Sequence, residues 1–190
     1  VLSCQFCAFG VKADHPTAYE KSLSEIFSDA EKYNRGDVSE FHIVGGLHPD
    51  YPFEYYLDLL RGLKERFPAV HIQAYTAVEV EYLSNLGDLT IKETLEVLKE
   101  AGLGSIPGGG AEVFAKRVRR KICGDKITGE EWLQVHETAH LIGMKSNATM
   151  LYGHLETDEE RSDHLVRLRE LQDQTQGFVT FIPLAFHPEN

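Results

Sequence analysis

The chain has 190 residues, of which 42% are hydrophobic, which is enough to form one sizeable core. Its formal net charge of −11 at pH 7 argues against nucleic acid and against an anionic membrane surface as partners. Three cysteines in so acidic a chain, no signal peptide at its start and only short apolar runs favour a cytoplasmic protein that does not enter a membrane.

Two cysteines come first along the chain, Cys4 and Cys7, with the aromatic Phe6 between them. Thiolates bind soft metal ions and iron–sulfur clusters, and a two-residue gap lets both sulfurs reach one centre. A redox dithiol and half of a zinc ribbon are the alternatives, but the ribbon would need a second cysteine pair. The remaining cysteine, Cys123, is expected to be a structural thiol.

Short strand-like runs then alternate with amphipathic helical segments. The strand candidates are residues 41–44, 70–75, 104–106, 145–150 and 178–184. One helix is expected to bury Tyr56, Leu59, Leu60, Leu63 and Phe67 on a single face. Three more are expected to begin with capping residues at Thr90, Thr128 and Thr157. The last of them should place Leu165, Leu168 and Leu171 on its inner face.

Strands that alternate with helices along the whole chain predict parallel pairing with right-handed crossovers. The strand count is smaller than the eight of a closed (β/α) barrel. We therefore predict an α/β fold, a partial (β/α) barrel of the TIM type with about five to six parallel strands. An open doubly wound sheet is the alternative, but no Gly-x-Gly-x-x-Gly turn follows the first strand. Residues 1–190 are expected to form a single domain.

Unusual residues follow each predicted strand, where a (β/α) barrel carries its active site. The strand-end segments are residues 45–49, 75–79, 107–112, 147–156 and 183–190. The glycines Gly45 and Gly46 would let a ligand approach the backbone closely, although a simple turn is the alternative. The glycine run at 108–110 is expected to be a tight loop between a strand and a helix, with a hinge or a phosphate-binding loop as alternatives.

Three histidines, His48, His154 and His187, also fall at strand ends, and a zinc or non-haem iron site would explain them. Since none of these three has a second histidine close by in sequence, structural or surface roles are favoured. His136 and His140 are four residues apart on a predicted helix and are also expected to be structural or exposed. The basic run 116–121 is expected to be a solvated helix face.

The segment from Cys4 to Phe9 resembles the end of the C-x-x-x-C-x-aromatic-C motif of radical S-adenosylmethionine (radical SAM) enzymes. The first cysteine of that motif would come directly before Val1, so the chain is expected to be a radical SAM core domain truncated at both ends. The five strand-end segments resemble the aminodeoxyfutalosine synthases. Dehypoxanthine futalosine cyclases and the synthases of the deazaflavin precursor of coenzyme F420 share much of this resemblance, but residues 76–79 and 184–187 favour the aminodeoxyfutalosine synthases.

The resemblance implies a [4Fe–4S] cluster held by Cys4, Cys7 and the missing cysteine, with S-adenosyl-L-methionine bound to it. The implied reaction adds the 5′-deoxyadenosyl radical to 3-[(1-carboxyvinyl)oxy]benzoate. It forms 6-amino-6-deoxyfutalosine with loss of carbon dioxide, a step of menaquinone biosynthesis. An electron donor such as flavodoxin or ferredoxin is implied as a partner. A zinc protein or a non-catalytic binding barrel is the alternative of another class.

Residue roles follow from the same resemblance. Phe6 would pack near the adenine, and Gly45 and Gly46 would contact the methionine part of the cofactor. The expected ribose or adenine contacts are Glu79, Ser105 and Gly153. From their positions in the strand-end loops, the residues expected to line the rim near the substrate are His48, Tyr75, Asn147, Thr149 and His187.

Overall fold

A computed structural model describes residues 6–7 and 15–188 of the chain. Its five strands form one parallel sheet in the order of the chain. The strands are β1 (Glu40–Ile43), β2 (His71–Ala74), β3 (Ser105–Ile106), β4 (Lys145–Tyr152) and β5 (Phe178–Ala185). The predicted strands are thus confirmed, with bounds that differ by one or two residues.

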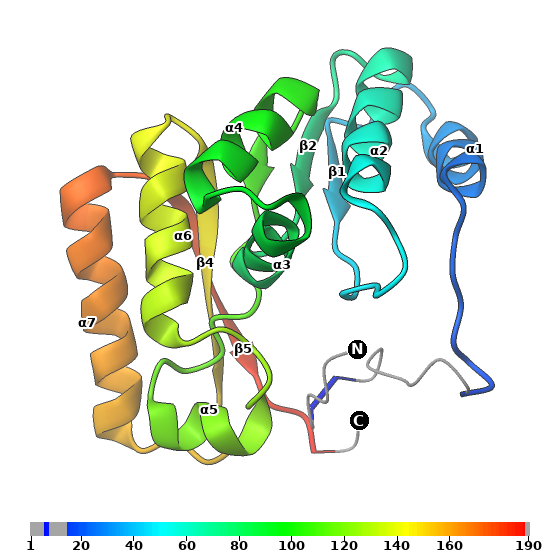
Figure 1. Cartoon of the computed structure of the whole chain (residues 1–190). Coiled ribbons are helices and arrows are strands. Elements are labelled where there is room, and N and C mark those ends of the chain that lie inside the picture. Colours follow the sequence, from blue (N-terminus) through cyan, green and yellow to red (C-terminus); the bar gives the residue numbers. More distant parts are fainter. Residues whose placement is uncertain (1–5, 8–14, 189–190) are drawn as a thin grey trace.

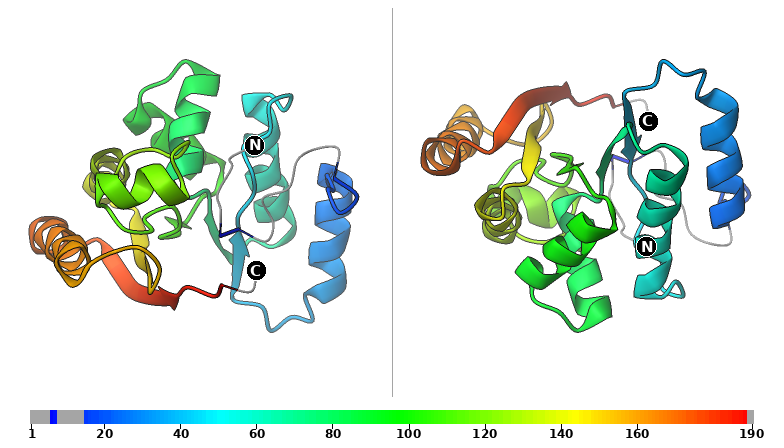
Figure 2. Two further views of the ribbon diagram at one scale, coloured as in Figure 1. Left: turned by 90° about the horizontal axis from the view of Figure 1, so that it is seen from below. Right: turned by 90° about the horizontal axis from the view of Figure 1, so that it is seen from above.

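Helices lie between the strands along the chain. They are α1 (Leu23–Tyr33), α2 (Phe53–Arg66), α3 (Ala77–Gly87), α4 (Ile91–Ala101), α5 (Lys116–Ile122), α6 (Gly129–Leu141) and α7 (Asp158–Thr175). Figure 1 shows α2, α3, α4, α6 and α7 on one face of the sheet. Seen along the strands in Figure 2, the sheet curves with these helices on its convex side. This arrangement is the predicted partial (β/α) barrel.

Capping side chains set where most of the helices begin. Thr90, Thr128 and Thr157 each form the predicted capping box, in which the Thr hydroxyl and a Glu carboxylate satisfy free backbone N–H groups. Thr76 forms another with Glu79 and begins α3 directly after β2. The sequence predicts a strand-end loop at residues 75–79, but a capping box and a polar strand end have the same composition, and the structure begins a helix there.

The main core lies between the convex face of the sheet and the helices. Fully buried side chains there include Leu60, Leu63, Ile72, Leu95 and Leu98. In α7, Leu168 and Leu171 are buried as predicted, but Leu165 is 42% exposed. The buried positions of α7 are His164, Leu168 and Leu171 instead. A spacing of four and then three residues keeps side chains on one face of a helix, whereas two successive steps of three residues move them off that face.

Buried histidines join α6 and α7 to the sheet. His136 Nδ1 and His140 Nε2 each lie 2.8 Å from the hydroxyl oxygen of Ser146 on β4, and His140 Nδ1 lies 2.7 Å from that of Thr175 on α7. His164 stacks on Phe114 with ring centroids 4.0 Å apart. His136 and His140 are therefore structural and buried.

We expect the protein to lose stability as the pH falls from about 6.5 towards 4. Burial lowers the pKa of His140 and of His164 to about 4 and that of His136 well below its usual value of 6.5. Since the unfolded chain binds protons near pH 6.5 and the folded chain does not, stability is complete above that pH and declines below it. The upper limit is about 1.4 kcal/mol per pH unit for each histidine.

Urea unfolding at several pH values checks this expectation. A His136→Gln variant should show a shallower decline than the parent protein, whereas His15→Gln, at an exposed position, should keep the parent slope. Equal stability of the parent protein at pH 6.5 and pH 5 would contradict the expectation.

Candidate functional site

The carboxyl ends of the parallel strands lie together at one end of the molecule, the lower end in Figure 1. Residues 6 and 7 lie against this rim. Phe6 packs onto a small apolar cluster made of Val113, Val118, Ile122, Cys123 and Met150. Cys7 is exposed, Cys123 is buried as expected for a structural thiol, and Cys4 lies outside the described residues.

Glu79 connects the first two strand-end loops. Its Oε1 accepts a hydrogen bond of 3.0 Å from the N–H of Gly45, and its Oε2 accepts bonds of 2.8 Å from the N–H and the hydroxyl of Thr76. The side chain is buried, which raises the pKa of its carboxyl. Both oxygens of this predicted ribose or adenine contact are thus bonded within the rim.

The two glycines after β1 differ in their surroundings. A Cβ at Gly45 would lie 3.7 Å from Glu79 Oε1, whereas a Cβ at Gly46 would meet no atom within 4 Å among the described residues. The backbone at Gly46 is therefore open to a ligand. Gly45 is positioned by Glu79.

The glycine loop after β3 is packed closely against β4. A Cβ at Gly108 would lie 2.7 Å from the carbonyl carbon of Ala148, so only glycine fits there. Thr149 donates a 2.5 Å hydrogen bond from its hydroxyl to the carbonyl of Gly108. This is the tight loop that the sequence predicts, and Thr149 holds it against β4.

The same loop is also bound from α5. The buried Arg119 donates hydrogen bonds to the carbonyl oxygens of Gly110, Ala111 and Ile127. The prediction that the basic run is a solvated helix face is therefore wrong for Arg119. Its guanidinium carries several N–H donors in one plane, and these donors bond the three carbonyl oxygens that α5 covers.

Gly153 turns the chain after β4 with a φ of +90°, which favours glycine. Its N–H and that of His154 donate to the carboxylate of Glu156 at 2.5 and 2.9 Å, and Arg161 lies 3.0 Å from the same carboxylate. Although burial opposes ionisation, these N–H groups lower the pKa of Glu156 to about 2. Glu156 is thus an ionised anchor for this loop.

Ser105 and Asn147 lie deeper than the rim, on the concave face of the sheet. Ser105 Oγ accepts a 3.1 Å hydrogen bond from Gln73 Nε2 and lies 2.7 Å from His71 Nε2. Asn147 donates from Nδ2 to Gln73 Oε1 at 3.2 Å. Gln73 therefore joins two predicted site residues. It is not among the predicted site residues, because its role depends on the register of the strands, which the sequence alone does not reveal.

The other predicted rim residues lie apart from this network. His48 Nε2 is 2.8 Å from a carboxylate oxygen of Glu20, and the ring stacks on Tyr51. His187 is exposed just after β5. Tyr75 has a φ of +57° that turns its side chain into the helical layer, where its hydroxyl donates to the carbonyl of Tyr56. The prediction that Tyr75 lines the rim is therefore wrong.

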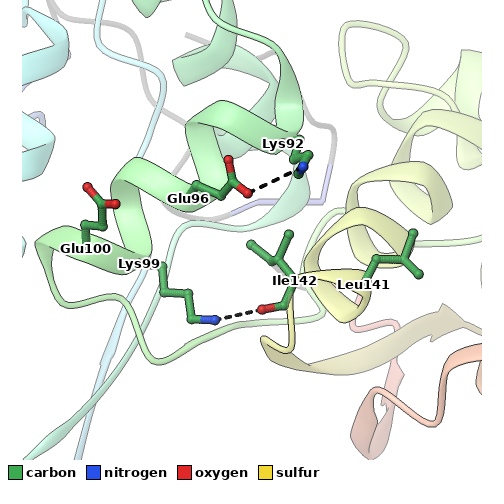
Figure 3. Close-up of a pocket in the computed structure, with 6 residues that line it drawn as sticks. All are labelled: Lys92, Glu96, Lys99, Glu100, Leu141 and Ile142. Carbon is green, nitrogen blue, oxygen red and sulfur yellow. Dashed lines mark hydrogen bonds and ion pairs between the residues drawn. The ribbon is translucent and has the colours of Figure 1, made fainter.

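Hollows elsewhere on the surface are shallow. The one in Figure 3 lies between α4 and the end of α6, away from the strand ends. Its two lysines are engaged, Lys92 with Glu96 and Lys99 with the carbonyl of Ile142. Within residues 6–7 and 15–188, no three His, Cys, Asp or Glu side chains gather in a geometry for a metal ion, and no helix is long and apolar enough to cross a membrane.

Comparison with known proteins shows which family the chain resembles. The profile of the Radical SAM superfamily matches residues 1–168. The aminodeoxyfutalosine synthase of Thermus thermophilus is 50% identical over 188 residues, which cover 99% of this chain and 50% of that protein. A 5-amino-6-(D-ribitylamino)uracil–L-tyrosine 4-hydroxyphenyl transferase of Methanopyrus kandleri is 39% identical over 98% of this chain and 51% of its own length. The chain thus spans about half the length of the curated relatives it matches.

Solved structures share the fold. HydG, a maturase of the [FeFe]-hydrogenase, superposes with a TM-score of 0.71 at 14% identity and covers 99% of this chain and 40% of its own. Streptococcus suis SuiB superposes with a TM-score of 0.64 at 14% identity over 98% of this chain and 37% of its own.

We expect Glu79→Ala to destabilise the protein and to loosen the Gly45 loop. The substitution removes a capping box and a carboxylate bonded to a second loop, at a cost of about 1–3 kcal/mol. Denaturant unfolding gives the first effect, and faster hydrogen exchange at the Gly45 amide gives the second.

Glu93→Ala is the matched control, because Glu93 forms the same capping box with Thr90 at an exposed position. It should cost less stability and leave exchange at Gly45 unchanged. Equal effects of the two substitutions on Gly45 would show that Glu79 does not hold the loop.

Proposed function

The chain belongs to the radical SAM superfamily, and we propose that it forms the cluster-binding part of an aminodeoxyfutalosine synthase. The observation that carries the proposal is the 50% identity to the Thermus thermophilus synthase across nearly the whole chain, against 39% for the hydroxyphenyl transferase of Methanopyrus kandleri. The family implies a [4Fe–4S] cluster, S-adenosylmethionine and a small-molecule substrate.

The described residues fit such a cluster. Cys7 presents an exposed thiol, and Phe6 beside it packs against an apolar cluster of the barrel, which positions this cysteine near the rim. Cys4 and a cysteine outside this sequence would complete the ligand set. When bound, the cluster and S-adenosylmethionine supply the 5′-deoxyadenosyl radical.

The rim residues would position the cofactor through backbone groups. Gly46 offers unobstructed backbone to the methionine part, and Gly45 is held beside it by Glu79. Gly153 offers a second open approach, since a Cβ there would meet no described atom within 4 Å. Phe6 and Glu79 stay in the proposal as adenine or ribose neighbours, with Glu79 acting mainly by fixing the loops. Ser105 is left out of this set, because it is buried below the rim and bonded to Gln73 and His71.

The proposed substrate is 3-[(1-carboxyvinyl)oxy]benzoate, which together with S-adenosylmethionine would give 6-amino-6-deoxyfutalosine, methionine and carbon dioxide, with no net oxidation or reduction. Asn147 and Thr149 on β4, with His48 and His187 from flanking loops, are its proposed neighbours. A flavodoxin or ferredoxin as electron donor and a cytoplasmic location belong to the same proposal.

A hydroxyphenyl transferase acting with tyrosine is the second candidate, favoured by the 39% identity to the Methanopyrus kandleri protein. Full-length protein with a reconstituted cluster should be given S-adenosylmethionine with either 3-[(1-carboxyvinyl)oxy]benzoate, dehypoxanthine futalosine, or tyrosine and 5-amino-6-(D-ribitylamino)uracil. Mass spectrometry should find 6-amino-6-deoxyfutalosine from the first mixture. Product from one of the other mixtures alone would replace the proposal.

Cys7→Ala in the full-length protein should abolish cluster binding, because the cluster loses one of its thiolates. Cys123→Ala is the matched control: it removes a buried thiol of the apolar cluster under Phe6 and should leave the iron and sulfide content near the parent value. Iron and sulfide analysis under anaerobic conditions measures both. A Cys7→Ala protein with full iron and sulfide would refute the cluster assignment, and zinc without sulfide in the parent protein would favour the zinc alternative.

A further inference from the structure

The concave face of the sheet carries a layer of polar side chains halfway along the strands. Strand register places His42 of β1 beside Gln73 of β2, and Gln73 beside Ser105 of β3. Register also places Asn147 of β4 beside Thr180 of β5. These five residues, one from each strand, are called the middle layer below.

The opposite face of the same strands is apolar. Phe41, Ile72, Ala74, Ile106 and Ala148 all pack into the core under the helices. Ser146 of β4 is the exception on that face, where His136 and His140 bond its hydroxyl. Since side chains alternate between the two faces of a strand, Gln73 and Asn147 lie on the concave face. The interior of a (β/α) barrel is usually filled with branched aliphatic side chains, so a polar layer there needs a reason.

Hydrogen bonds fix the orientation of side chains in the middle layer. Gln73 and Ser105 are each 5% exposed, and Gln73 donates to Ser105 while it accepts from Asn147. These bonds determine how the amide of Asn147 is oriented. Among the described residues, the second N–H of Asn147 has no hydrogen-bond partner, and the side chain is only partly buried.

The donors left in the layer suit an anion. His42 and Thr180 are exposed on either side of the network, and each can donate a hydrogen bond. No carboxylate belongs to the middle layer, although the chain as a whole carries a charge of −11. Register places Lys145 of β4 beside Ser105, and Glu40 lies two residues before His42 on β1, so one charge of each sign borders the layer.

We propose that the middle layer binds a carboxylate group of the substrate, with Asn147, His42 and Thr180 as the contacts and Gln73 and Ser105 as positioning residues. The inference rests on the proposed function, whose substrate has two carboxylates. It adds the position of one of these carboxylates, which would lie on the concave face, below the rim that holds the cofactor. A substrate held there is oriented by an amide whose own direction is fixed in advance.

Gln73→Glu in the full-length, cluster-loaded protein tests the proposal. The new side chain still accepts from Asn147, but its charge would repel a substrate carboxylate. The dissociation constant and the KM for 3-[(1-carboxyvinyl)oxy]benzoate should rise at least tenfold. The melting temperature is measured on the same sample, because a carboxylate at this buried position also costs stability. Gln134→Glu, which adds the same charge on the exposed face of α6, should leave the dissociation constant unchanged.

Thr180→Val is the second variant, because it removes one donor at an exposed position without changing the size of the side chain. It should raise the same dissociation constant several-fold and leave the fold intact even if Gln73→Glu disturbs it. Unchanged binding in both folded variants overturns the middle-layer proposal alone. A parent protein that forms 5′-deoxyadenosine but does not bind 3-[(1-carboxyvinyl)oxy]benzoate overturns the proposed function, and the middle-layer inference with it.

Discussion

The direction of the five strands is the constraint on which the site depends. Because all of them are parallel and follow one another in the sheet, every strand ends at the same rim and every connection must return outside the sheet. The returning helices cover the convex face and bury its apolar side chains (Figure 2). The concave face and the rim are thereby left for ligands, and the polar residues of the strands gather there.

A rim built from loops needs hydrogen bonds from side chains to keep its shape, since loops make few backbone hydrogen bonds of their own. Side chains from other segments hold the first two glycine loops of the rim, and a side chain from within the loop holds the third. Glu79 holds Gly45, Thr149 holds Gly108, and Glu156 holds Gly153. The backbone groups that would meet a cofactor are therefore positioned before it binds, which lowers the entropy cost of binding.

Much of this arrangement could be predicted from the sequence, because strand positions and helix starts depend on local patterns. The capping boxes at Thr90, Thr128 and Thr157 are examples, and so is the tight loop at Gly108. Tertiary geometry decided the rest. A positive φ turned Tyr75 away from the rim, and Arg119 was buried because loops on both sides of α5 fold back and present carbonyl oxygens to its guanidinium. The link between Gln73 and Asn147 spans 74 residues, so only the register of the sheet could reveal it.

The rim and the concave face constrain the sequence in different ways. At the rim, the side chains of Glu79, Thr149 and Glu156 bond backbone N–H and carbonyl groups. Since backbone groups depend little on residue type, the rim can keep one geometry for a cofactor that a whole family shares. On the concave face, contacts depend on the side chains themselves, and a single change from amide to carboxylate alters the charge that a substrate meets. Relatives that share the rim but act on different substrates should therefore differ mainly at the level of Gln73 and Asn147, where the identity of the side chain decides what binds.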